Sequence, residues 1–112
     1  MRKGVRLQFY FPEGARHQHL LLHEWLLDAA RKCGIKGGSA FRAIAGFGRH
    51  GNVHYGHFFE EAGKLPVEVR LVTTPELAGR LLDLVRSERV QVFFVRSEVE
   101  YGWVPDDSAP GQ

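Results

Sequence analysis

The sequence predicts an α+β sandwich in which two helices cover one face of an antiparallel sheet. Three observations carry this prediction. Apolar residues recur at every second position in several short segments, which is typical of strands buried on one side. Two other segments repeat their apolar residues at intervals of three and four, as amphipathic helices do. Strands and helices follow one another in the order βαββαβ, which is the order of a ferredoxin-like domain.

The length and composition indicate one domain of ordinary globular type. The 112 residues suffice for a single core, which we assign to residues 1–104, whereas residues 105–112 offer nothing to bury and are expected to be a disordered tail. The net charge of +2, with dispersed basic residues, argues against a nucleic-acid partner. The single Cys33 is typical of a reducing compartment. No stretch approaches the ~20 apolar residues of a membrane span, so we expect a cytoplasmic protein without membrane insertion.

The first half of the chain predicts two strands and a helix between them. Residues 5–11 alternate between apolar and polar and form the first strand. A helical apolar stripe extends over residues 17–33, and Gly34 followed by Ile35 is typical of a helix C-terminal cap. Residues 39–47 then return as the second strand.

The second half repeats this plan after a polar segment rich in glycine and histidine at residues 48–64, which we interpret as a loop. Residues 65–72 form the third strand. The second helix starts either with Thr74 as N-cap and proline in the first helical position, or with a capping box that begins at Thr73. Residues 90–95 are the fourth strand, and residues 99–104 either extend it or form a short fifth one.

The sheet face without helices is expected to carry a mixture of apolar and charged side chains. Its members are Gln8, Tyr10, Glu68, Arg70, Val72, Gln91, Phe93 and Val95. This mixture is too apolar for a wetted surface and too charged for a core. It predicts packing against other copies of the chain, with Glu68 and Arg70 paired across strands or subunits. The alternative is a partly exposed sheet on a monomer.

A glycine-rich turn, Gly46–Gly51, matches the pattern G-x-G-x-x-G. A dinucleotide-binding fingerprint must open a helix, and a protein kinase needs a much longer chain, so both interpretations fail here. Glycine amides and the Arg49 guanidinium can nevertheless surround one anion. The turn therefore predicts a phosphate-binding nest, with a simple strand bend or bulge as the alternative.

The segment Gly46-Phe47-Gly48-Arg49 resembles the turn by which PII signal-transduction proteins leave their second strand and enter the long T-loop. The wider pattern, residues 38–48 with 65–69 after the loop, is still more similar to the family of small PII-like proteins. The resemblance extends over residues 5–104. It implies a homotrimer whose sheets face the centre, with ligand clefts between neighbouring subunits and residues 48–64 as the T-loop equivalent.

In PII proteins these clefts hold adenine nucleotides, so the resemblance implies ATP, ADP, AMP or another small anionic metabolite as ligand. By position, the candidate nucleotide-binding residues are Arg42, Gly46, Phe47, Gly48, Arg49, His50 and Arg89. The 48–64 loop would change shape on binding and control a partner, a membrane transporter or an enzyme. Residues 86–89 depart from the family because they lack the glycines of its second loop, which leaves Arg86 or Arg89 as the phosphate contact there.

The histidines give a second hypothesis. His19 and His23 are spaced for one helix face, but two ligands are too few for a structural zinc site, so we expect them to face solvent. The loop residues His50, His54 and His57 are candidate metal ligands, and the alternative function is a divalent-metal-binding tolerance protein. The chain has no recognisable nucleophile turn, and we expect no catalytic residues and no enzymatic activity.

Overall fold

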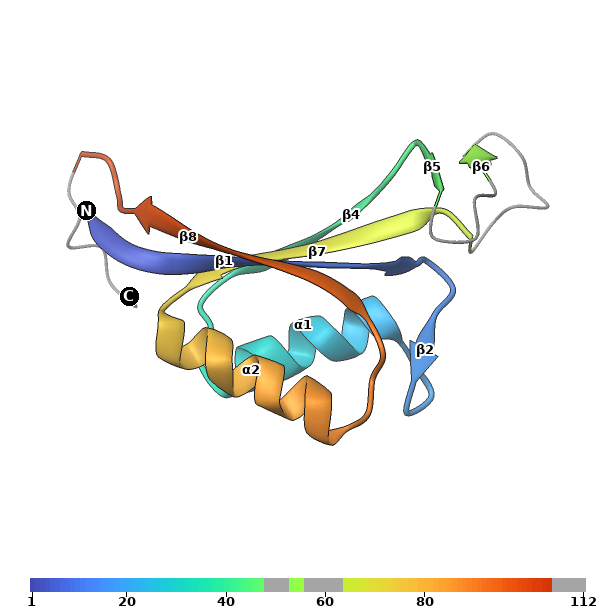
Figure 1. Ribbon diagram of the computed structural model, residues 1–112, viewed down its shortest axis with the longest axis horizontal. Coiled ribbons are helices and arrows are strands. Elements are labelled where there is room, and N and C mark those ends of the chain that lie inside the picture. Colours follow the sequence, from blue (N-terminus) through green and yellow to red (C-terminus); the bar gives the residue numbers. More distant parts are fainter. Residues whose placement is uncertain (48–52, 56–63, 106–112) are drawn as a thin grey trace.

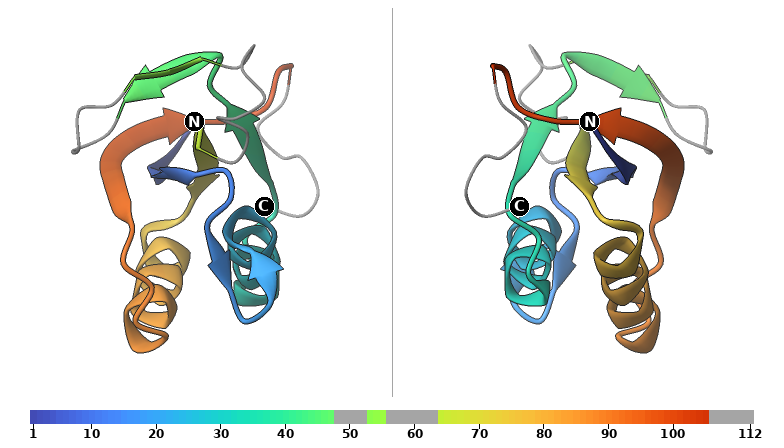
Figure 2. Two further views of the ribbon diagram at one scale, coloured as in Figure 1. Left: turned by 90° about the vertical axis from the view of Figure 1, so that its right-hand side faces the viewer. Right: turned by 90° about the vertical axis from the view of Figure 1, so that its left-hand side faces the viewer.

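The computed structural model describes residues 1–47, 53–55 and 64–105. It confirms the ferredoxin-like arrangement, with both helices on the same face of the main sheet (Figures 1 and 2). The sheet consists, in spatial order, of β4 (Gly38–Arg42), β7 (Pro66–Thr73), β1 (Arg2–Pro12) and β8 (Phe93–Tyr101), and all neighbours are antiparallel. The helices are α1 (Leu22–Cys33) and α2 (Pro75–Ser87). Within the described ranges, neither helix has the length and apolar composition needed to span a membrane.

The core lies between the helices and the two central strands. The buried apolar residues of these four elements are Val5, Leu7, Phe9 and Phe11 of β1, Val67, Val69 and Leu71 of β7, Leu22, Trp25, Leu26, Ala29 and Ala30 of α1, and Ala78, Leu81 and Val85 of α2. Full burial of one large apolar side chain contributes about 1.5–3 kcal/mol. The alternation along β1 places its other side chains on the opposite face, which no helix covers.

Local sequence signals fix one end of each helix. Gly34 has a φ of +105°, and the N–H of Ile35 donates to the Ala30 carbonyl at 3.1 Å, as expected for the C-terminal cap of α1. At the start of α2 the Thr74 hydroxyl accepts a hydrogen bond from the N–H of Leu77 at 3.2 Å. Of the two starts considered, the Thr74 N-cap is the one that forms. Arg89, which follows the C-terminus of α2, also has a positive φ, of 58°.

The first helix begins later than predicted, at Leu22 instead of near His17. The preceding residues form a two-stranded hairpin of β2 (Arg16–His17) and β3 (Leu20–Leu21). Its two turn residues, Gln18 and His19, have φ angles of 51° and 67°, as in a type I′ turn. His19 therefore does not share a helix face with His23, and that prediction was wrong.

The predicted strand 39–47 is broken into two pieces. β4 pairs with β7 as far as Arg42, and the chain then continues into β5 (Ala45–Phe47). Since the nitrogen of Pro66 carries no hydrogen, the ladder with β7 cannot continue past it. β5 pairs instead with β6 (Val53–Tyr55), and the two form a separate ribbon at one end of the sheet (Figure 1). β6 lies within the segment predicted to be a loop.

The last strand also differs from its prediction. β8 starts at Phe93, three residues later than expected, and continues unbroken to Tyr101. The segment 99–104 therefore extends the fourth strand and does not form a fifth. Gln91 precedes the strand and was wrongly placed on the open face of the sheet.

Candidate functional site

The sheet face opposite the helices carries the other predicted residues and keeps large apolar groups exposed. Tyr10 lies opposite Glu68 on one side and Phe93 on the other, and its ring centre is 6.0 Å from that of Phe93. Phe93 is 68% exposed and Val95 37%. The register thus gathers an apolar patch on a face that, within the described residues, no helix covers.

A polar network occupies the middle of this face. The Arg70 Nε donates to Glu68 Oε2 at 2.6 Å, and the Gln8 amide donates to the Tyr10 hydroxyl at 3.0 Å. The Glu68–Arg70 pair was predicted across strands or subunits, but it joins two residues of β7. Burial alone would raise the pKa of Glu68, but hydrogen bonds from Arg70 and Tyr10 outweigh it and hold the pKa below its ordinary value. Burial, reinforced by the Glu68 carboxylate, raises the pKa of Tyr10.

A groove of about 520 Å³ opens at one end of the same face. Its lining includes two cationic side chains, three aromatic rings and the accessible backbone of residues 37–39. The Tyr101 and Trp103 rings stand edge to face with centres 6.4 Å apart, and the Arg70 guanidinium lies 5.0 Å from the Phe41 ring centre. Aromatic walls accept a flat ring, and cations and amides accept an anion. Together with Lys36, these residues can hold a ligand that has a flat ring and an anionic group.

Gly4 makes one wall of the groove possible. A Cβ at Gly4 would lie 2.5 Å from Cε1 of Tyr101 and 2.7 Å from the Thr73 carbonyl oxygen. Only glycine lets the Tyr101 ring lie directly against β1. The groove wall is thus determined by a residue at the other end of the sequence.

The predicted glycine turn lies at the opposite end of the sheet from the groove. Gly46 and Phe47 belong to β5, and Phe47 is 69% exposed. A Cβ at Gly46 would approach Cγ of Pro66 to 2.8 Å, so the close approach of β5 to β7 requires glycine here. Gly48, Arg49 and His50 lie outside the described residues, and the phosphate nest they were expected to form stays a prediction.

The two other predicted nucleotide-binding residues do not line the groove either, although Arg42 directly follows Phe41, which does. Arg42 ends β4 and pairs with the Glu13 carboxylate at 3.4 Å. Arg89 follows α2 in the helical layer with a φ of +58°. In Figure 1 α2 ends on the side of the molecule where β2 and β5 lie, whereas β8, whose last residue Tyr101 lines the groove, ends on the opposite side. Arg42 and Gly46 thus lie toward one end of the sheet, and the groove opens toward the other end.

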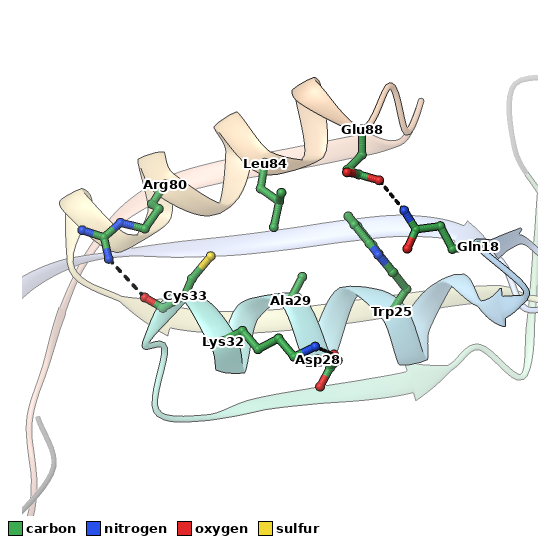
Figure 3. A pocket seen from close by; sticks show the side chains of 9 residues that line it. All are labelled: Gln18, Trp25, Asp28, Ala29, Lys32, Cys33, Arg80, Leu84 and Glu88. Carbon is green, nitrogen blue, oxygen red and sulfur yellow. Dashed lines mark hydrogen bonds and ion pairs between the residues drawn. The ribbon is translucent and has the colours of Figure 1, made fainter.

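A second, smaller groove of about 380 Å³ separates the two helices (Figure 3). Its floor includes Trp25 and Leu84, and the half-buried Cys33 lines it. The Gln18 amide donates to Glu88 Oε1 at 2.7 Å across one end. This groove lies on the face of the helices, away from the residues considered above.

The described residues do not test the hypothesis that the loop histidines bind a metal ion. His50 and His57 lie outside the described residues, and for His54 only the backbone of β6 is described. Among the residues that the structure describes, no three His, Cys, Asp or Glu side chains are grouped to hold a metal ion.

Sequence reasoning missed the groove residues Lys36, Tyr101 and Trp103. The available signal was the pair of aromatic residues flanking Gly102 at the end of an alternating strand. Its meaning depends on the pairing of β8 with β1, which brings Tyr101 opposite Arg2. Arg2 then lies with its guanidinium carbon 6.0 Å from the Trp103 ring centre.

Comparison with known proteins relates this chain to proteins with the same fold. Residues 4–101 match the model of the DUF190 family (Uncharacterized ACR, COG1993). The UPF0166 protein of Aquifex aeolicus (strain VF5) is 27% identical over 86 residues, which are 77% of this chain and 82% of that protein. A crystal structure described as a PII-like signaling protein from Thermus thermophilus superimposes with a TM-score of 0.64 at 17% identity, covering 87% of each chain.

CPII, a nitrogen regulatory PII-like protein from Thiomonas intermedia K12, superimposes with a TM-score of 0.65 at 21% identity, covering 91% of each chain. That structure is bound to ADP, AMP and bicarbonate. The resemblance to PII-like proteins is confirmed in the fold, and the family match spans nearly all of the described chain. The chain therefore belongs to the DUF190 family and has the fold of PII-like signalling proteins.

Proposed function

We propose that this chain is a PII-like regulatory protein that binds an adenine nucleotide, or a similar small anionic metabolite, between the subunits of a homotrimer. The groove beside Tyr101 and Trp103 carries the proposal, because it combines aromatic walls with Lys36 and Arg70. The flat base of a nucleotide can stack on the aromatic walls, and its phosphates can pair with Lys36 and Arg70. The binding of ADP and AMP by CPII, which shares the fold, supports this choice of ligand.

The positions of the two candidate half-sites favour a cleft between subunits. Gly38 lines the groove and Gly46 starts the glycine turn, and the chain between them extends for up to about 26 Å. In this proposal the two half-sites that complete one nucleotide site come from neighbouring subunits. In a closed ring of copies, the groove of one subunit would meet the Arg42–Phe47 end of the sheet of the next, and the same contact would repeat at every interface. The exposed apolar patch around Phe93 supplies a surface for that association.

The regulatory step follows from the place of the glycine turn. Gly46 and Phe47 form β5, which pairs with β6, so a ligand that contacts the turn also contacts the base of this ribbon. Occupancy would shift the conformations of residues 48–64, and a partner protein would recognise the difference. A coupling of about 1–3 kcal/mol is enough for such a switch. The proposed cycle contains no catalytic step.

Titration calorimetry on the full chain tests this function with ADP, AMP, ATP and, separately, Zn²⁺ and Mg²⁺. We expect binding of an adenine nucleotide that weakens at least tenfold in Trp103→Ala and in Arg42→Ala, because each loses one contact in a largely desolvated cleft. Arg31→Ala, which removes an exposed arginine of α1, serves as the control and keeps the wild-type affinity. No binding of any adenine nucleotide, or a response to metal ions alone, contradicts the proposal. Phosphate release from ATP above the protein-free rate contradicts its non-enzymatic part.

A further inference from the structure

The strand β8 forms one margin of the main sheet, and its outer edge is unpaired. The strand order is β4-β7-β1-β8, so within the described residues only β1 pairs with β8 (Figure 2). β8 has nine residues, more than the usual five or six, and contains neither glycine nor proline. Its first three side chains, Phe93, Phe94 and Val95, are 68%, 42% and 37% exposed. A long apolar edge strand with free N–H and C=O groups is a template for pairing with another chain.

The charges of β8 are complementary to themselves when two copies of the strand run antiparallel. If Ser97 lies opposite its own equivalent, residues at equal distances on its two sides meet across the pair. Arg96 then faces Glu98 of the partner subunit, and a two-fold axis repeats this ion pair. Both side chains are exposed, and within the described residues neither forms an ion pair. Pairing of two copies supplies the opposite charge that each of them lacks.

The same register also matches the open faces of the two sheets. Val95 faces Val99 of the partner subunit, and Phe93 faces the partner's Tyr101. Such β-branched and aromatic pairs stabilise neighbouring antiparallel strands. Ser97 lies on the axis, and its Oγ is buried without a hydrogen-bond partner in the described part of the chain. The hydroxyl of Ser97 of the partner subunit supplies one.

Other positions of the two-fold axis fit the strand less well. An axis at Arg96 or at Glu98 places that charge opposite its own equivalent, which is unfavourable. An axis at residues 93–95 or 99–101 pairs at most five of the nine residues. The axis at Ser97 pairs the whole strand and places opposite charges together.

We propose that the outer edge of β8 is an interface for a second copy of this chain, which joins two four-stranded sheets into one continuous antiparallel sheet about a two-fold axis at Ser97. This inference goes beyond the proposed function and requires no ligand. The proposed ring joins subunits at the two ends of their sheets, whereas β8 runs along the side, so the ring leaves this edge free. The edge contact therefore joins two rings.

Sedimentation equilibrium on the full chain tests the pairing through its charges. We expect the assembly found at low concentration to double in mass as the concentration rises. Arg96→Glu and Glu98→Arg each place like charges opposite one another twice, and each should weaken the doubling at least tenfold. An equal mixture of the two variants, and the double variant Arg96→Glu/Glu98→Arg, bring opposite charges together again and should recover it. Arg31→Glu makes the same charge change on α1, which lies against β4 and β7, and keeps wild-type pairing.

A disulfide tests the register. Opposed Cα atoms of an antiparallel pair lie about 4.5–5.5 Å apart, which a disulfide can bridge. In a Cys33→Ser background, Ser97→Cys should therefore join two chains covalently under mild oxidation. Val95→Cys on the same face is the matched control, because its own equivalent lies about 14 Å away along the strand. It should cross-link only when it is mixed with Val99→Cys.

Three results each overturn the inference: a wild-type mass that does not double, equal doubling in Arg96→Glu, or cross-linking of Ser97→Cys no faster than that of Val95→Cys. Circular dichroism and the thermal midpoint of each variant distinguish lost pairing from unfolding. Failure of the pairing leaves the proposed function intact, because ADP binding in calorimetry does not use this edge. A wild-type chain that binds no ADP contradicts the proposed function alone, and sedimentation still decides the pairing.

Discussion

Gly46 passes so close to Pro66 that a Cβ on the glycine would lie 2.8 Å from Cγ of the proline ring. The same proline ends the pairing of β4 with β7, and its carbonyl accepts a hydrogen bond from the N–H of Ala43 at 2.9 Å. Pro66 thereby sends the chain out of the main sheet and gives β5 the surface on which it lies. The base of the β5–β6 ribbon is fixed by this contact.

Gly46→Ala is expected to lower the free energy of unfolding by about 1–3 kcal/mol, because the added methyl overlaps a ring that has little freedom to move. Gly79→Ala is the matched control: it lies inside α2, and apart from its chain neighbours and the backbone of its own helix no atom lies within 4 Å of its Cβ position. That change should stabilise the protein by about 0.5–1 kcal/mol. Urea unfolding measures both, and equal stability of Gly46→Ala and wild type would refute the contact.

The ionisation of Glu68 should make the free energy of unfolding depend on pH in the acidic range. Although burial opposes it, hydrogen bonds from Arg70 and Tyr10 lower the folded-state pKa of Glu68 below its ordinary 4.5. A carboxyl with a lowered pKa stabilises the fold above its unfolded-state pKa, and this contribution is lost as the pH falls through the folded-state value. Between about pH 5 and pH 3, wild-type protein should lose more stability than Glu68→Gln. Urea midpoints that fall in parallel for both proteins would exclude the effect.

Phe93→Glu should dissociate the proposed trimer. The ring is exposed in the middle of the apolar patch on the open face, and a carboxylate buried there without a partner opposes association strongly. Leu20→Glu introduces the same charge on an exposed apolar residue of β3 and should leave the oligomer intact. Sedimentation equilibrium distinguishes the two variants. A wild-type monomer, or an unchanged trimer in Phe93→Glu, would show that this face is not the interface.

The elements with strong local signals could be predicted from the sequence. Alternation in residues 5–11 and the helical stripe around Leu26 correspond to real elements because tertiary packing uses the same apolar residues. The β2–β3 hairpin could not be found, since its turn residues Gln18 and His19 are neither glycine nor asparagine. The break after Arg42 depends on a proline in a neighbouring strand, which no pattern within residues 39–47 contains.

The candidate site divides in the same way. The glycine turn is contiguous, so its residue types predict a phosphate nest without a structure, and this stays a prediction because Gly48, Arg49 and His50 lie outside the described residues. The groove joins Lys36 to Tyr101 and Trp103, which are far apart in the chain and meet only through the order of the strands. The positive φ of Arg89 could not be predicted either, because an arginine after a helix does not indicate a left-handed backbone.

Complementation between subunits tests the central claim, that one ligand site is shared by two copies of the chain. The double variant Lys36→Ala/Trp103→Ala impairs the groove, and Arg42→Ala/Arg49→Ala impairs the turn. Each variant alone should bind no ADP in calorimetry. After the two are unfolded and refolded together in equal amounts, about a quarter of the wild-type sites should return, since one interface in about four then combines two intact halves. A mixture as inactive as its components, or full binding by either variant alone, would contradict the shared site.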